Sequence, residues 1–525
     1  MNIPLLIETL SYLRPSQIFH QLKVRLHQPK YRAVAVPAVL QFSQIVKPID
    51  KPQCYNNSGS FTFLNLTSSF KGWNMNEYGA LWAYNLNYMD WLQQKDITQE
   101  EGLKWIDKFI DDLPDNRVGL DPYPTALRII NWAKFFCQHP QCLDLRRRDS
   151  MYAQSILLSR KLEYHLLGNH LLEDAYAIFI ASIFFNDNHL FGKANRLLAS
   201  QLEEQILPDG AHYEQSPMYH CIMLDRLLDC VNFSDNNLLF DGQDTFTTLL
   251  REKASLMLGH LKSIVYQDGS IPLLNDAANG IAPTAQELFA YAERLHLHWA
   301  VQPLKECGYR KMGNDSMEIV ADIGSIACSY QPGHSHADTF NYEMRIDGQP
   351  VIVDTGISTY NKNVRRQYER STAAHNTVSV ESRDSSRVWG GFRVGRRATV
   401  QIVKDTPSEL VARHNGFGRH ALHQRRFAFS SDELCIEDEI VGTGNDECVS
   451  YLHFSPRQHA CFVSEADGLV KTGDIVIKIE GFARLELKRN QVATKYNKLE
   501  ECDVLEMTFC HHLKYQIRTT FHTQM

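Results

Sequence analysis

The 525-residue sequence lacks any apolar run of about twenty residues, so no membrane-spanning helix is expected. It also lacks a C-x-x-C pair, and although it has twelve cysteines it is too long for a small disulfide-stapled domain. Reduced thiols in the core are therefore expected. No small-residue cleavage site follows the N-terminal apolar run, which Glu8 interrupts, so a secretory signal peptide is not indicated. The sequence alone favours a cytoplasmic location.

An excess of positive charge is also missing, because the formal net charge is -7. Such a surface does not favour nucleic acid, and an acidic partner would need a local basic site. Residues 361–400 contain nine Lys or Arg against three acids, a local balance of +6. A solvated loop would explain this charge equally well, but the stretch is the natural place for an acidic ligand.

No fixed-period repeat is present, which argues against a helical solenoid. Prolines and polar residues mark residues 1–75, which we expect to form an irregular, partly helical extension. Helical apolar spacing marks residues 76–310, and short alternating segments separated by turn residues mark 311–525. We therefore predict an α+β multidomain fold, in which an α/α toroid precedes an antiparallel β-sandwich.

Individual elements follow from the same periodicity. Helices are expected near residues 78–94, 99–113, 122–137, 148–166, 170–185, 189–206, 214–232 and 244–266. Strands are expected at residues 318–330, 341–346, 377–380, 398–403, 426–429, 433–440, 449–454, 475–479, 485–488 and 504–509.

Two clusters of polar residues lie at predicted helix starts. Asn169 and His170 begin one helix, and Glu173 follows one turn later. An N-cap with a capping-box glutamate would explain that pattern without any catalytic role. The second cluster places Tyr213 and Tyr219 in one short segment with two histidines. Aromatic packing at a helix start is the alternative explanation there.

Two further clusters lie in the predicted strand region. His334 and His336 point to one face of an extended segment, and two imidazoles on one face can bind a metal. Asp354 and His375 would complete a ligand set, although any one of these histidines taken alone fits an ordinary surface or hydrogen-bonded residue. Residues 360–370 supply a phenol hydroxyl and guanidinium groups, which suit a carboxylate or a sulfate.

In chain order these clusters read G-N-H-x-x-E, D-G-x-x-x-E-x-S-P-x-Y-H, H-x-H, V-D-T-G and A-H-N-T. Together they resemble the heparinase II/III family of polysaccharide lyases and the related oligoalginate lyases. The motifs span roughly residues 75–400. The resemblance implies a bacterial protein with an active cleft between a helical toroid and a β-sandwich. It also implies an acidic polysaccharide or oligosaccharide substrate, and it adds the periplasm as an alternative location.

The resemblance assigns roles to individual residues. The implied catalytic residues are Asn169, His170, Tyr219, His334 and Tyr360. Candidate substrate-binding residues are Glu173, Tyr213, Arg366 and Arg370. The resemblance also implies a structural divalent metal, whose ligands would be His336, Asp354 and His375. Zinc is expected in preference to manganese or calcium. Met223 stands where some members carry an arginine, so that subsite differs here.

The chemistry of β-elimination suits these residue types. Neutralising a uronate carboxylate acidifies the C5 proton, and a base and an acid then act at C5 and at the leaving O4. Tyr219 and His334 can share these roles in either order, depending on the uronate epimer. One alternative is a glycoside hydrolase with a carboxylate pair drawn from Asp174, Glu214 and Asp276. Another is a non-catalytic glycan-binding protein of surface-polysaccharide synthesis. The polymer and the oligomeric state stay open.

Overall fold

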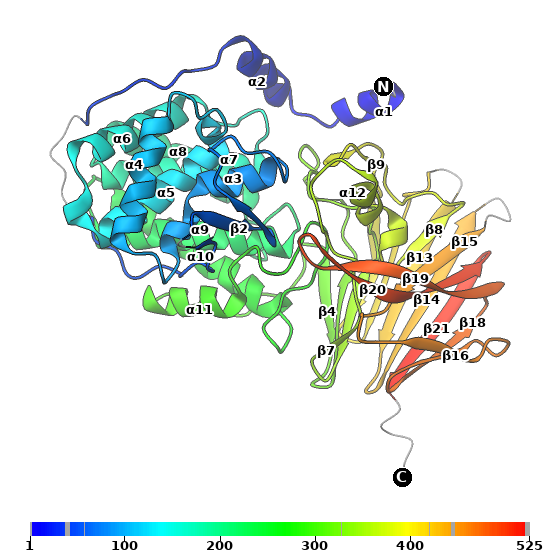
Figure 1. The fold of residues 1–525 in the computed structure, drawn as a ribbon. Helices are drawn as coiled ribbons and strands as arrows, with labels where there is room; N and C mark the ends of the chain where they lie inside the picture. The colour runs from blue at the N-terminus through cyan, green and yellow to red at the C-terminus, as the bar shows by residue number, and fades with distance from the viewer. Residues whose placement is uncertain are drawn as a thin grey trace.

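A computed structural model describes residues 3–36, 43–56, 58–326, 328–418, 421–442 and 447–519. A largely helical part comes first along the chain and a β-sheet part follows it, as Figure 1 shows. The predicted α+β multidomain class is therefore confirmed. The last helix of the first part ends at Arg294, and the strands of the second part begin at Tyr309. In the described ranges, no helix combines the length and the apolar character that crossing a bilayer requires.

The helices are α1 (Ile3–Leu10), α2 (Pro15–Leu26), α3 (Ala80–Tyr88), α4 (Gln99–Asp112), α5 (Pro122–Gln138), α6 (Leu145–Arg160), α7 (Gly168–Phe184), α8 (Asn188–Gln205), α9 (Pro217–Asn236), α10 (Gln243–Ile264), α11 (Ala285–Arg294) and α12 (Val364–Glu369). Helices α3 to α10 correspond to the eight that periodicity predicts. Helix α7 is buried along almost its whole length and packs against α5, α8 and α9. It is therefore the central helix of this part, and it carries Asn169 and His170.

The strands are β1 (Tyr55–Asn56), β2 (Ser60–Phe63), β3 (Leu66–Ser69), β4 (Tyr309–Gly313), β5 (Met317–Asp322), β6 (Tyr342–Ile346), β7 (Gln349–Ile352), β8 (Val378–Val380), β9 (Val388–Trp389), β10 (Arg393–Val394), β11 (Val400–Thr406), β12 (Glu409–His414), β13 (Ala421–Phe429), β14 (Glu433–Gly442), β15 (Cys448–His453), β16 (Ala460–Ser464), β17 (Leu469–Thr472), β18 (Ile475–Glu480), β19 (Arg484–Lys495), β20 (Lys498–Phe509) and β21 (His512–Thr519).

The strands of the second part form antiparallel sheets around a core of their own. The largest has eight strands in the order β11-β12-β13-β14-β21-β18-β17-β16. Two four-stranded sheets have the orders β19-β20-β15-β8 and β4-β5-β6-β7. Burial alternates along strands such as β12 and β13, as expected where one face of a sheet meets a core and the other meets solvent.

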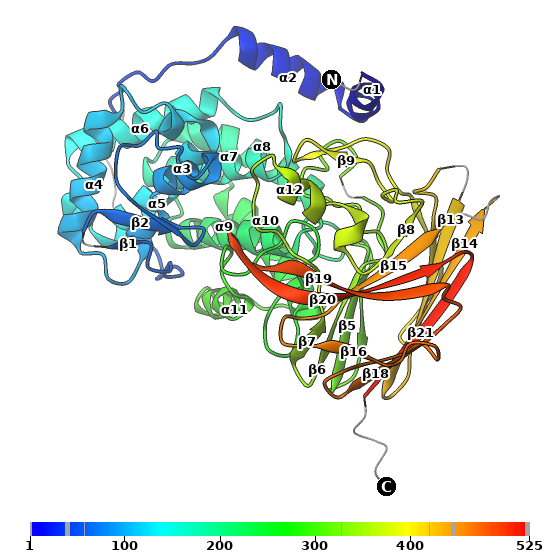
Figure 2. The same ribbon diagram turned by 45° about the vertical axis from the view of Figure 1, so that its right-hand side comes forward.

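A small sheet of β1, β2 and β3 lies in the helical part, within residues that the sequence suggests are irregular. The turn between β2 and β3 meets the turn between β19 and β20, a hairpin that reaches toward the helical part in Figure 2. The Asn65 side chain donates to the carbonyl of Tyr496 at 2.7 Å, and the Asn497 side chain donates to the carbonyl of Leu64 at 2.9 Å. These bonds fix the two parts against each other on this side.

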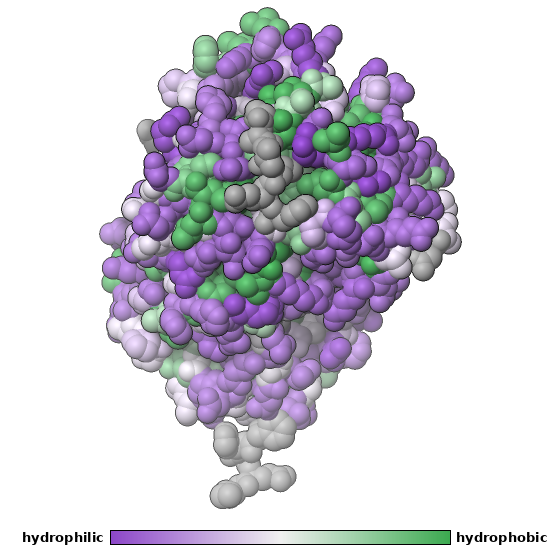
Figure 3. Space-filling model, turned by 90° about the vertical axis from the view of Figure 1, so that its left-hand side faces the viewer, coloured by the Kyte–Doolittle hydropathy of each residue, from purple (hydrophilic) through white to green (hydrophobic). Residues whose placement is uncertain are grey.

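On the other side, the N-terminal helices cross from one part to the other (Figure 1). Glu8 in α1 accepts a hydrogen bond from Arg387, beside β9, at 2.9 Å. Arg14, just before α2, pairs with Glu204 in α8 at 2.5 Å. The end of the helical part that faces away from the sheets is mostly hydrophilic, with scattered hydrophobic patches (Figure 3). Such a surface is typical of a face that meets water.

Candidate active site

His334 lies in the loop between β5 and β6 and is held by Asp276, from the loop after α10. Its Nδ1 lies 2.9 Å from an Asp276 carboxylate oxygen, which can only accept, so Nδ1 carries the proton. Nε2 therefore carries the lone pair and accepts from the Asn169 side-chain amide at 3.3 Å, and the Glu214 carboxylate lies 3.6 Å from it. The imidazole is 7% exposed. This bonding leaves Nε2 as the nitrogen that can take a proton.

Asp276 is a shared acceptor for three side chains. Besides His334, it accepts from Nε2 of His336 at 2.8 Å and from the Arg366 guanidinium at 2.5 and 2.7 Å. Burial alone would raise the pKa of Asp276, but Arg366 and the two imidazoles hold it well below its usual range. Arg366, a predicted substrate-binding residue, is fully buried and engaged here instead. Its role in the structure is to hold the Asp276 carboxylate.

Two tyrosines lie beside the His334 ring. The rings of Tyr219 and His334 have centroids 3.9 Å apart and are tilted by 30°. The Tyr360 hydroxyl donates to the Tyr219 hydroxyl at 3.4 Å, and both tyrosines are half-buried. Tyr219 is placed here because Ser216 caps α9, its hydroxyl accepting the Tyr219 N–H at 3.2 Å, with proline in the first turn. Burial raises the pKa of Tyr219, although the Tyr360 hydrogen bond works against this, so the phenol is protonated near neutral pH.

The start of α7 brings Asn169 and His170 to the same region. The Asn169 side chain donates to the Glu214 carboxylate at 2.9 Å. The Nδ1 of His170 lies 2.9 Å from the Glu163 carboxylate, and the Tyr123 ring lies 4.6 Å from the imidazole between centroids. Burial lowers the pKa of His170, but the Glu163 charge outweighs it, so the pKa lies above its ordinary value. His170 is half-buried, which leaves part of the ring open to a ligand.

The capping-box explanation for this helix start is wrong. The N-cap of α7 is Leu167, with no side-chain cap, and Glu173 has no hydrogen-bond partner among the described residues. Glu173 lies fully buried with its carboxylate 3.6 Å from Arg226. Tyr213 is also buried. The structure therefore does not bring these two predicted substrate-binding residues to the surface near His334.

Arg370, the last predicted substrate-binding residue, is buried as well. Its guanidinium donates twice to the carbonyl of Ser335, at 2.8 and 3.2 Å. Since Ser335 lies between His334 and His336, Arg370 fixes the backbone of the loop that carries both histidines.

The predicted metal ligands gather behind this loop. Nδ1 of His375 lies 2.7 Å from an Asp354 carboxylate oxygen, and the His336 and His375 rings have centroids 5.3 Å apart. Within the described chain, Nδ1 of His336 and Nε2 of His375 have no hydrogen-bond partner although both are buried. A carboxylate oxygen of Asp338 and Nε2 of His453 are likewise unpartnered. Buried imidazoles with free lone pairs beside carboxylates fit zinc by their chemistry.

A second group of metal-type residues, which the sequence does not single out, is Asp209, His260 and Cys307. Their potential ligand atoms all lie within 4.8 Å of one another, and all three residues are buried. The set differs from His336, Asp354 and His375 and lies away from the His334 loop in the chain.

Several residues at this site were not predicted in these roles. Asp276 and Glu214 enter the sequence reasoning solely as hydrolase carboxylates, and Glu163 does not enter it. A histidine at a reacting position needs an orienting carboxylate, but this general requirement does not say which acidic residue supplies it. The two carboxylates lie on either side of the His334 ring, and Asp276 is tied to Arg366. They hold the imidazole and do not form an open acid–base pair, which disfavours the hydrolase alternative.

Helices followed by antiparallel sheets, with a histidine–tyrosine pair drawn from both parts, define a two-part α+β protein. The profile described as "Heparinase II/III N-terminus" matches residues 149–297. The profile described as "Heparinase II/III-like, C-terminal" matches residues 258–516. The chain belongs to the heparinase II/III family.

Individual relatives are distant. A protein named heparin-sulfate lyase from Bacteroides stercoris is 21% identical over 315 residues, which cover 53% of this chain and 45% of that protein. One of the same name from Bacteroides thetaiotaomicron is 21% identical over 337 residues, 56% of this chain and 46% of that protein. The matched part thus spans less than half the length of these curated relatives.

Solved structures share the fold over more of the chain. A heparan sulfate lyase mutant from Pedobacter heparinus superposes with a TM-score of 0.62 and 16% identity, covering 96% of this chain and 87% of that one. A heparinase III structure gives a TM-score of 0.67 at 14% identity, covering 85% of this chain and 79% of that one. At these identities the likeness establishes a common architecture.

Proposed function

We propose that this protein is a polysaccharide lyase that cleaves a uronate-containing acidic polysaccharide by β-elimination and leaves unsaturated uronate ends. One observation carries the proposal: Asp276 fixes His334 through Nδ1 while the imidazole lies against Tyr219, 3.9 Å between centroids. An oriented base and a phenol acid then stand together where one sugar ring can meet both. Glu214 and Asp276, the carboxylates beside His334 in the described residues, are not an open pair of the kind that hydrolysis would need.

In the proposed reaction, Nε2 of His334 removes the C5 proton, because the hydrogen bond from Nδ1 to Asp276 places the ring's lone pair on Nε2. The electrons of the C5–H bond form the C4–C5 double bond, and the C4–O4 bond breaks. Tyr219 donates its proton to the departing O4, which suits a phenol whose pKa burial has raised. We therefore propose His334 as the base and Tyr219 as the acid, an assignment that the sequence leaves open.

The substrate carboxylate must be neutralised before C5 can lose a proton. Asn169 and His170, at the start of α7, are proposed to do this by an amide hydrogen bond and by the positive charge that Glu163 favours on His170. Since Arg366 and Arg370 are buried, the exposed Arg393 and Lys362 are better placed to meet acidic groups of the polymer. Arg393 follows Phe392, whose ring lies 6.4 Å from His334.

His336, Asp354 and His375 are proposed to hold a structural divalent metal, with zinc preferred to manganese or calcium because two ligands are imidazoles. The unpartnered nitrogens of His336 and His375 support this fit. Such an ion would stiffen the loop that carries His334, and the residues around Asp276 would still perform the reaction.

We also propose that residues 1–75 are an extension, that residues 76–310 form the α/α toroid, and that residues 311–525 form the β-sandwich.

A heparin-type glycosaminoglycan is proposed as the first substrate to test, since the curated relatives carry the name heparin-sulfate lyase. Alginate and bacterial capsular polymers complete the panel. The assay follows the ultraviolet absorbance of the conjugated double bond in the product. New reducing ends without that absorbance would overturn the lyase proposal in favour of hydrolysis, and binding without any product would favour a non-catalytic role.

A further inference from the structure

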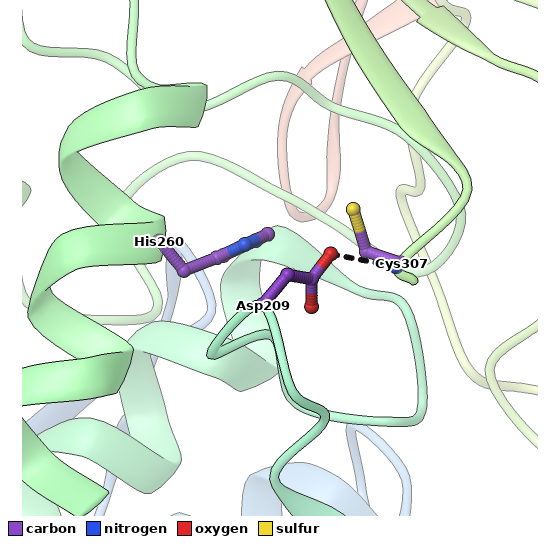
Figure 4. A group of neighbouring side chains, drawn as sticks. All are labelled: Asp209, His260 and Cys307. Carbon is purple, nitrogen blue, oxygen red and sulfur yellow. Dashed lines mark hydrogen bonds between the residues drawn. The ribbon is translucent and has the colours of Figure 1, made fainter. Parts of the chain in front are cut away.

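Asp209, His260 and Cys307 meet where the helical part gives way to the sheets. Asp209 lies in the turn after α8, His260 in α10 and Cys307 in the segment that leads into β4, as Figure 4 shows. Their potential ligand atoms lie within 4.8 Å of one another. The three side chains thus come from three separate segments and converge at one buried point.

The Asp209 carboxylate is a buried anion. It accepts hydrogen bonds from the backbone N–H groups of Cys307 at 2.9 Å and Lys305 at 3.0 Å. No Lys or Arg side chain of the described chain forms an ion pair with it. Buried charges in proteins are paired or coordinate a metal, so this carboxylate lacks a cation.

His260 and Cys307 present further ligand atoms next to that charge. Nδ1 of His260 is buried and has no hydrogen-bond partner in the described residues. An imidazole nitrogen with a lone pair left open in this way is a common zinc ligand. Cys307 is a free thiol whose Sγ lies 3.4 Å from the N–H of Tyr309. A cavity of about 10 Å³ lined by both His260 and Cys307 has room for one water.

We propose that Asp209, His260 and Cys307 bind a structural zinc ion, with a water in the adjacent cavity as the fourth ligand. Carboxylate oxygen, imidazole nitrogen and thiolate sulfur are the donor types that zinc accepts in a tetrahedral shell. Sulfur disfavours magnesium and calcium. Binding displaces the thiol proton to solvent, and the resulting thiolate and the Asp209 carboxylate together balance the dication. The site then carries no net charge, so burying it costs little desolvation free energy.

His220 is the neighbouring imidazole that does not join the ligand set. Its ring lies 5.0 Å from that of His260 between centroids. Its Nε2 donates to the carbonyl of Met257 at 3.1 Å, and its Nδ1 accepts the N–H of His212 at 3.3 Å. Both nitrogens are therefore engaged.

The ion would join the turn after α8 and helix α10 to the segment before β4, so it would fix the junction of the two parts. This role is independent of the proposed reaction.

The test uses the full-length protein freed of metal by a chelator and refilled with cobalt(II). A thiolate bound to cobalt gives a charge-transfer absorption in the near ultraviolet, which the His336, Asp354 and His375 set cannot produce because it contains no sulfur. We expect this band in the wild-type protein and in His375→Gln. Its absence from the wild-type protein would overturn the proposal without bearing on the lyase reaction.

Substitutions at the proposed ligands test which residues bind the ion. Cys307→Ser and His260→Gln should each lower the zinc content by about one equivalent per chain, and Cys307→Ser should lose the cobalt–thiolate band. Cys221→Ser, which alters another buried cysteine in α9, is the matched control and should keep both. Equal zinc content in Cys307→Ser and Cys221→Ser, with the band retained in both, would overturn the assignment.

Discussion

Asp276 accepts the Nδ1 proton of His334 at 2.9 Å, and this bond decides which nitrogen of the imidazole can act as a base. The same carboxylate neutralises Arg366. Orientation of the histidine and compensation of a buried cation therefore depend on one side chain, and the two effects can be separated by experiment.

Asp276→Asn should lower kcat/KM by about 100-fold, because the amide no longer enforces the Nδ1–H tautomer. It should also destabilise the fold by about 3–5 kcal/mol, because Arg366 becomes an unpaired buried charge. The double variant Asp276→Asn/Arg366→Met should regain stability but not turnover. Thermal unfolding and steady-state kinetics check the two effects, and recovery of turnover in the double variant would contradict the orienting role.

Tyr219→Phe should lower kcat/KM by roughly 100- to 10,000-fold, since it removes the proposed proton donor to O4. The melting temperature should change little, because Tyr219 is half-buried and its hydroxyl makes a single long hydrogen bond, 3.4 Å to Tyr360, within the described residues. Tyr152→Phe, in α6, is the matched control and should leave kinetics unchanged. Turnover of Tyr219→Phe within a few-fold of wild type would show that another group protonates the leaving oxygen.

Glu163→Gln should change the pH profile of kcat/KM. Glu163 raises the pKa of His170, so His170 carries its charge below that pKa and loses it as the pH rises. Without the carboxylate, the alkaline limb of the profile should move to lower pH. An alkaline limb that stays in place in Glu163→Gln would mean that the charge on His170 does not support binding of the uronate.

His375→Gln should lower the bound zinc by about one equivalent and reduce the melting temperature, because His375 is a proposed ligand behind the His334 loop. Metal analysis and thermal unfolding check this result. His423→Gln, at another buried histidine in β13, is the control for metal content. Full zinc occupancy in His375→Gln would remove this residue from the ligand set.

Asp438 should make the sheet part sensitive to acid. It is fully buried and accepts from Arg425 at 2.7 and 2.8 Å and from His423 at 2.7 Å. Burial raises the pKa of Asp438, but Arg425 outweighs this and holds it far below the unfolded value of about 3.9. The stability that the Asp438 charge adds to the folded state is fully present above the unfolded pKa, and it is lost as the pH falls toward the folded pKa. Asp438→Asn should be less stable at neutral pH and should lose less stability between pH 5 and 3, as urea unfolding would show.

Helices and the motif residues were the predictable part of this protein. Helices α3 to α10 follow from long segments with helical apolar spacing, although α7 is buried on almost every side and presents no single apolar stripe. Strands β12 and β21 escaped prediction although they alternate, because short alternating segments compete with turns and loops that look alike. Asn169, Tyr219, His334 and Tyr360 were chosen by motif, and the structure brings them together.

The supporting residues were harder to predict. Asp276 lies in an irregular loop without periodicity, and nothing local indicates that it reaches His334, 58 residues away in sequence. Arg366 and Arg370 were assigned to substrate because a guanidinium group suits a carboxylate or a sulfate, but the two side chains turn inward to a carboxylate and a carbonyl. A sequence gives the charge of an arginine and not the direction in which its side chain points.

The N-terminal helices tie the first residues of the chain to its later half, since Glu8 meets Arg387 across a separation of 379 residues. During synthesis, α1 cannot reach its docking place until the ribosome has completed β9. At about 5–20 residues per second this takes roughly 20 to 75 seconds. For that interval Leu5 and Leu6, which are half-buried in the folded protein, lie open to water on an undocked helix, and a chaperone that binds apolar segments could cover them.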